Sequence, residues 1–185
     1  MAEDECVLDR IMHMVNSGDN RGLVQLMVGF REEWNSLMEE NRRLKKELHL
    51  KNLDLRGMDL KGIDLSGVEI EDSDMSGSDL TGADLSGARI TGVKFADATL
   101  YSVNLQSARI SQSDFSRVHL YGSSTYNMHM TGSVNLFDAY MERHDPSIEE
   151  TYRTHPEITK RGFRMLEAAE YEIEHPDEED EDQGY

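Results

Sequence analysis

Apolar residues return at every fifth position through the middle of this chain. The series keeps one frame from Leu50 to Met130, and Thr125 is its one polar member. Neither an α-helix, with a period of 3.6, nor a β-strand, with a period of 2, repeats at five. The pattern therefore predicts a turn-based repeat whose large residues point to a common interior: Leu50, Leu55, Leu60, Leu65, Ile70, Met75, Leu80, Leu85, Ile90, Phe95, Leu100, Leu105, Ile110, Phe115, Leu120 and Met130.

Each five-residue unit carries two further marks. The residue two places before the central one is large in the first units, from Leu48 to Val68, and mostly small from Ser73 onward. Glycine recurs two places after the centre, as at Gly57 and Gly92, which is typical of the positive-φ position of a type II turn. Four such corners close a square of 20 residues, and successive squares can stack as a solenoid about 20 Å long.

The units resemble those of the pentapeptide-repeat proteins, whose consensus is A(D/N)LXX. The segments ADLSG and SDLTG carry the likeness, which covers residues 48–132 in seventeen in-frame units. This resemblance implies a right-handed quadrilateral β-helix of about four coils, here flanked by N-terminal and C-terminal α-helices.

A coil of 20 residues also assigns the outward side chains to four faces. One face is predicted to carry His49, Glu69, Arg89, Arg109 and His129. The other three carry, in order, Asp54, Asp74, Lys94 and Asp114; Asp59, Asp79, Thr99 and His119; and Asp64, Asp84, Asn104 and Ser124.

The N-terminal segment, residues 1–48, is predicted to form a helix hairpin. Residues 5–17 have one apolar helical face, and a longer helix is expected from Asn20 to His49. The longer helix has a heptad seam, which consists of Met27, Phe30, Trp34, Leu37, Asn41, Leu44 and Leu48. A lone asparagine in such a seam commonly fixes the register of parallel dimers. The seam therefore predicts either a dimeric coiled coil or an amphipathic helix that caps its own β-helix.

Three further segments complete the expected organisation. The β-helix occupies residues 49–132 and a C-terminal helical cap residues 133–174, with a longer helix over Glu157 to Glu174. Residues 175–185 form an acidic tail that we expect to be disordered, because a run of six acids repels itself and buries nothing.

Charge narrows the range of partners. The 185 residues include 37 acids and 19 bases, a net charge of −18. Such a chain is not expected to bind nucleic acid or anionic membranes directly, since both require a basic face. It can bind a basic protein surface, including one that normally holds DNA. No apolar run approaches a membrane span, no signal-peptide pattern opens the chain, and the lone Cys6 has no disulfide partner, so we expect a cytoplasmic protein.

Catalytic chemistry is not indicated. Of the seven histidines, His119 and His129 fall on different predicted faces and so form no metal pair. Cys6 has no activating neighbour in sequence, and the glycines belong to turns rather than to a phosphate loop. We therefore expect no enzyme activity, no cofactor and no metal site.

Two functional hypotheses remain. Some members of the resembled family imitate duplex DNA with an acidic β-helix and occupy the DNA-binding saddle of gyrase. An inhibitor or protector of that kind would use the acidic residues Asp54, Asp59, Asp64, Glu69, Glu71, Asp72, Asp74, Asp79 and Asp84. Against this, aspartate before the central residue is the family consensus and can simply support the turn.

The second hypothesis is a homo-oligomeric structural or adaptor component of a larger assembly, for example a phage particle. There the heptad seam would join copies, with a dimer favoured, and the rod would be a rigid spacer. Under either hypothesis the partner is a protein.

Overall fold

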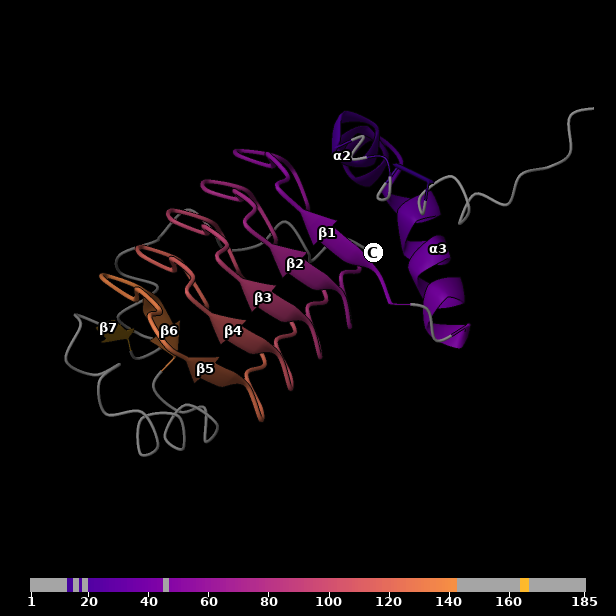
Figure 1. The fold of residues 1–185 in the computed structure, drawn as a ribbon. Coiled ribbons are helices and arrows are strands. Elements are labelled where there is room, and N and C mark those ends of the chain that lie inside the picture. Colours follow the sequence, from indigo (N-terminus) through magenta and orange to yellow (C-terminus); the bar gives the residue numbers. More distant parts are fainter. Residues whose placement is uncertain (1–12, 15–16, 18–19, 45–46, 143–163, 167–185) are drawn as a thin grey trace, which may run out of the picture.

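The computed structural model describes residues 13–14, 17, 20–44, 47–142 and 164–166. Two helices, α2 (Asn20–Gly29) and α3 (Arg31–Arg43), precede a rod of short strands (Figure 1). The strands are β1 (His49–Lys51), β2 (Glu69–Glu71), β3 (Arg89–Thr91), β4 (Arg109–Ser111), β5 (His129–Thr131), β6 (Tyr140–Glu142) and β7 (Arg164–Leu166).

The rod is a parallel β-solenoid that closes one coil every 20 residues. Strands β1 to β5 form one parallel sheet in sequence order, in which Leu50 faces Ile70 and Ile70 faces Ile90. Isolated parallel bridges build the other three walls, beginning at Asp54–Asp74, Asp59–Asp79 and Asp64–Asp84. These pairings confirm the quadrilateral β-helix and all four predicted faces.

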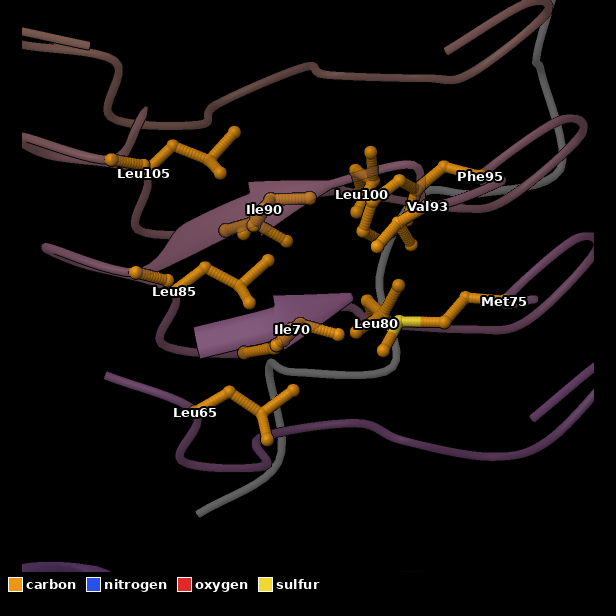
Figure 2. Packing of buried hydrophobic residues seen from close by; sticks show 14 of the residues in the cluster. Leu65, Ile70, Met75, Leu80, Leu85, Ile90, Val93, Phe95, Leu100 and Leu105 are labelled. Atoms are coloured by element: carbon orange, nitrogen blue, oxygen red, sulfur yellow. The ribbon is translucent and has the colours of Figure 1, made fainter. Parts of the chain in front are cut away.

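The interior is filled by the residues of the five-residue series. Leu55, Leu80 and Phe95 have no exposed surface, and Thr125 is 1% exposed. Side chains of the same wall stack from coil to coil, as Figure 2 shows for Leu65, Leu85 and Leu105. The rings of Phe95 and Phe115 lie 4.6 Å apart. Because full burial of one such side chain is worth roughly 1.5–3 kcal/mol, this column is the main source of the stability of the rod.

The corners turn through left-handed backbone, as the glycine pattern predicts. Gly92 has a φ of 68°, and Asn52 takes the same place with a φ of 56°. At many corners a backbone hydrogen bond closes the turn between residues three apart. Met58 N–H, for example, donates to the carbonyl of Leu55 at 3.2 Å. At the corner after the strands the amide of Leu53 instead donates to Ser73 Oγ of the next coil at 3.1 Å. The serine at position 73 thus fits the crowded interior beside the corner and also accepts a hydrogen bond from the neighbouring coil.

The β-helix continues beyond its predicted end at residue 132. One extra residue follows β5, so that Asp114 pairs with Asn135 and His119 with Tyr140, at a spacing of 21. Val134, Leu136 and Ala139 are buried in the extended core. The boundary predicted at residue 132, and the helical cap predicted to begin at residue 133, are therefore wrong over residues 133–142. The extra residue shifts the five-residue frame by one position. A search that keeps the original frame therefore misses the units after residue 132.

The segments after this point are described in part. Strand β7 pairs in parallel with β6, with Met141 opposite Met165. These three residues of β7 are a strand where a helix was expected over 157–174. The remainder of the predicted cap, 143–163 and 167–174, and the acidic tail, 175–185, lie outside the described residues.

The N-terminal helices also differ from the prediction. The helix expected from Asn20 to His49 is broken at Phe30, whose φ of −137° is not helical, and α3 ends at Arg43. The first predicted helix, residues 5–17, lies mostly outside the described residues. Among the helices that are described, none combines the length and apolarity that crossing a membrane requires.

Candidate protein-interaction surface

Helix α3 closes the first coil of the rod. Trp34 Nε1 donates a hydrogen bond of 2.8 Å to the carbonyl of Asp64, and Asn35 Nδ2 donates one of 2.8 Å to the carbonyl of Gly62. The amide of Asp64 returns a bond of 2.8 Å to Asn35 Oδ1. Backbone groups that would otherwise end the solenoid as an open edge are thereby satisfied.

This contact decides how the heptad seam is used. Five of its residues are buried within the chain, and two are exposed: Phe30 by 50% and Leu44 by 48%. The buried five are Met27, Trp34, Leu37, Asn41 and Leu48, and all but Asn41 belong to the main hydrophobic core. The seam therefore serves the capping alternative, and the continuous coiled-coil helix of the dimer alternative is not formed. The physical reason is that the first coil has large apolar residues at its open end, which α2 and α3 cover.

The nine predicted acidic residues lie together in the first two coils. Three of them, Asp54, Asp59 and Asp64, are ladder neighbours of Asp74, Asp79 and Asp84 on three successive faces. Glu69 and Glu71 flank the buried Ile70 in β2, and Asp72 follows at the corner. The rod carries nine acids and three bases between residues 50 and 84, but two acids and four bases between residues 85 and 131. Residues 132–142 of the rod add two more acids and no base, so residues 85–142 are neutral and the net negative charge of the rod lies in its first two coils.

Basic residues lie against most of these acids. Eight of the nine have a cationic or protonatable partner, and seven of the contacts have N–O distances between 2.6 and 3.8 Å. The pairs are Asp54–Arg56, Asp59–Arg31, Asp64–Arg42, Glu69–His49, Glu71–Lys51, Asp72–Lys51, Asp74–Lys94 and Asp79–Lys61. Surface pairs of this kind are worth about 0–1 kcal/mol each, but they lower the negative potential of the faces. Arg31 and Arg42 come from α3, so the cap neutralises part of the first coil.

Among the described residues, the pair of Asp54 with Arg56 has the largest pKa shifts. The side-chain hydrogen bond from Arg56, with the backbone amide of Arg56 and its charge adding to it, lowers the pKa of Asp54 from 3.8 to about 2. A hydrogen bond from Arg117 likewise holds the pKa of Asp97 below its usual value. The hydrogen bond that Lys51 donates to Glu71 raises the pKa of Lys51.

Six of the nine aspartates and glutamates also support the turn that follows them. In each case Oδ1 accepts the backbone N–H two residues on, as Asp84 does from Ser86 at 2.8 Å and Asp79 from Thr81 at 3.0 Å. Asn104 and Asn135 accept the same bond from Gln106 and Phe137. The bond therefore needs an oxygen at this position but not a charge.

Three carboxylates of the acidic set remain widely accessible. The side chains of Asp54, Asp59 and Asp72 are 63%, 64% and 60% exposed, whereas that of Asp64 is 14% exposed. These three define the acidic surface of the first two coils that a partner can reach. Within the described residues, no cluster of three or more metal-ligating side chains is present.

Sequence reasoning missed the residues that attach the cap. Arg31, Asn35 and Arg42 were not singled out, because they lie outside the apolar seam and their partners are 22 to 29 residues away. In the sequence these residues form a row of polar positions beside the seam. A helix exposed to solvent would show the same row, so the pattern does not identify a contact.

Comparison with known proteins bears on the fold. The family model described as pentapeptide repeats, in 8 copies, matches residues 47–82 and 78–117. No curated protein sequence matches the chain.

Several solved structures are similar to this one. The pentapeptide repeat protein Rfr23 of the cyanobacterium Cyanothece 51142 is 25% identical, with 49% of this chain and 58% of that chain covered and a TM-score of 0.34. The protein alr5209 of Nostoc PCC 7120 is 22% identical, with 63% and 90% covered and a TM-score of 0.37. QnrB1, a plasmid-mediated fluoroquinolone resistance protein, is 12% identical, with 52% and 54% covered and a TM-score of 0.28.

The chain thus spans little more than half the length of Rfr23 and of QnrB1. The family match over residues 47–117 coincides with the coils built from the five-residue series. Residues 47–117 of this chain are therefore pentapeptide repeats, in their sequence and in the fold of their coils.

Proposed function

We propose that this protein is a non-catalytic binding protein whose rod contacts a protein partner through the acidic surface of its first two coils. The observation that carries the proposal is the segregation of nine acids to residues 50–84, where parallel bridges hold them in register on outward faces. A rigid solenoid presents such charges without an entropic cost of ordering on binding.

The partner is proposed to be a DNA-handling protein, most concretely a gyrase-like topoisomerase, which this protein inhibits or protects by occupying its DNA-binding surface. A basic surface complements exposed carboxylates and raises the association rate. The contact depends on Asp54, Asp59 and Asp72, because their carboxylates stay 60–64% exposed although each also has a cationic partner within the chain.

A supercoiling assay with matched variants tests this function. In the test variant, Asp54→Asn and Asp72→Asn remove two accessible charges. In the control, Asp114→Asn and Asp97→Asn make the same changes in the later coils: Asp54 and Asp114 precede a central residue, and Asp72 and Asp97 occupy left-handed corners. Asparagine occupies both kinds of position in this chain, at Asn104 and Asn52, so each variant should fold.

The expected result is that the protein alters topoisomerase activity, and that the test variant needs at least about tenfold more protein for the same effect. The control is expected to resemble the parent. If the two variants behaved equally, the acidic surface would not be the site that contacts the topoisomerase.

A second function, an oligomeric structural or adaptor component, has one observation in its favour. Phe30 and Leu44 are large apolar residues of the capping helices, and about half of each is exposed. In this candidate they, rather than the buried seam, contact another copy.

A further inference from the structure

The outer face of the β1–β5 sheet carries two arginines that are not used by the acidic surface. Arg89 and Arg109 are direct neighbours in the ladder, so their backbones lie about 4.8 Å apart, and both side chains are exposed. We propose that they form a docking site for carboxylates, and that its occupant is the acidic run of this chain, residues 177–182.

The charge environment of the two arginines sets them apart. Lys51, Arg56, Lys61, Lys94 and Arg117 each contact an acid of the rod. Among the described residues, no carboxylate forms an ion pair with Arg89 or Arg109. Glu69, the ladder neighbour of Arg89, instead bonds to His49 Nδ1 at 2.7 Å. Like charges side by side on a sheet are unfavourable, and a bound anion would relieve their repulsion.

The shape of this region suits an extended acidic segment. A hollow of about 280 Å³ is lined by both arginines, together with Gly67, Gly87 and Ser107 at the adjoining corners. Both arginines are exposed where they line this hollow. A guanidinium binds a carboxylate through two parallel hydrogen bonds, so two neighbouring arginines match two carboxylates of one peptide.

An acidic peptide fits better than a nucleic acid. Glu47 and Glu69 also line this hollow, and Glu69 is the ladder neighbour of Arg89, so the space for an anion is confined to the two coils that carry the arginines. A long polyanion would also meet the net charge of −18 of the whole chain, whereas a short run contacts this patch alone.

The acidic run of this chain is within reach. Its sequence is DEEDED, and it begins eleven residues after Leu166, the last residue of β7. Eleven residues span at most about 36–40 Å. Strand β7 pairs with β6, whose Tyr140 pairs with His119. His119 is ten residues, or half a coil, beyond Arg109, so the tether starts on the opposite wall and has to pass around the rod. A tether of this length gives an effective concentration near the millimolar range, which compensates for a weak contact.

A peptide-binding experiment tests the site in the full-length chain. The six acids of the run are changed to Asn or Gln to free the site, and a labelled peptide of residues 173–185 is titrated at low salt by fluorescence anisotropy. Arg89→Gln with Arg109→Gln is the test variant. Lys61→Gln with Lys94→Gln is the control, since it changes the net charge equally on other faces.

The test variant is expected to bind the peptide at least tenfold more weakly, and the control within twofold of the parent. The chain with its native run should bind the added peptide at least fivefold more weakly, because the run already occupies the site. Equal losses in both variants, or no loss in the test variant, would overturn the proposal. Displacement of the peptide by a short oligonucleotide at lower concentration than by unlabelled peptide would also overturn it. Asp54 and Asp72 do not take part, so this result is separate from the test of the proposed function.

Discussion

Trp34 Nε1 donates a hydrogen bond of 2.8 Å to the carbonyl oxygen of Asp64, and this bond joins the N-terminal helices to the rod. The indole is fully buried and belongs to the same hydrophobic core as the first coil. The cap and the solenoid should therefore unfold together rather than as separate units.

Substitution of Trp34 tests that coupling. Trp34→Phe removes the donor to the Asp64 carbonyl and part of the buried ring, and is expected to lower the free energy of unfolding by roughly 1–3 kcal/mol. Phe30→Leu is the control, because Phe30 is 50% exposed, and its effect should stay within about 0.5 kcal/mol. Urea unfolding followed by far-UV circular dichroism is suitable, since the chain has one tryptophan and fluorescence would be lost. A Trp34→Phe variant as stable as the parent would show that the cap is dispensable.

The aspartates before the central residues are expected to act in the turns through their oxygens. Asp84→Asn keeps an acceptor for the amide of Ser86 and should leave stability nearly unchanged, whereas Asp84→Ala should cost about 0.5–1.5 kcal/mol. Asn104, the next residue on the same face, already makes this bond in its own coil. Urea midpoints of the two variants check the prediction. A larger loss for Asp84→Asn than for Asp84→Ala would mean that the charge itself is needed.

Acid titration should reveal the Asp54–Arg56 pair. The pKa of Asp54 in the folded protein, about 2, lies below the ordinary value of 3.8. The contribution of this pair to stability is therefore present above about pH 4 and is lost as the pH falls toward 2. Arg56→Gln should raise the midpoint of the Asp54 carboxyl toward 3.8, as measured by carbon-detected NMR. The midpoint of Asp97, whose pKa is lowered by Arg117, should not move and is the internal control. An unchanged Asp54 midpoint would contradict the assignment of its cause.

The oligomeric candidate makes a separate prediction. If Phe30 and Leu44 join copies, then Phe30→Ser with Leu44→Ser should lower the mass measured by light scattering to that of one chain of 21.1 kDa. Leu37 is left unchanged in this experiment, because it is buried in the core and its replacement would unfold the cap. A parent protein that is already monomeric, or a variant of unchanged mass, would remove this candidate.

The period of five in the sequence was enough to predict the rod. A central apolar residue and a left-handed corner at fixed offsets allow few other backbones, so the wall of each outward residue followed from counting. The period was also the reason for the error at the far end, since one inserted residue before Val134 moved Leu136 and Ala139 out of frame.

The ends of the rod were less predictable, because the sequence pattern of an amphipathic helix does not show which surface covers its apolar face. The spacing of Trp34, Leu37 and Asn41 fits a dimer seam and a cap equally well. The break at Phe30 directly follows Gly29, a weak helix former, and the regular spacing of the seam outweighed this local signal in the prediction. The ion pairs of Asp59 with Arg31 and of Asp64 with Arg42 depend on where that helix lies, so the neutralisation of the acidic faces could not be read from the repeat.

The most direct measurement of the central claim is competition between this protein and duplex DNA for a gyrase-like topoisomerase. The acidic surface predicts that the protein displaces labelled DNA from the enzyme, and that Asp54→Asn with Asp72→Asn raises the required concentration at least tenfold while Asp97→Asn with Asp114→Asn does not. Simultaneous binding of DNA and this protein to the enzyme, or displacement that is the same for both variants, would contradict the account.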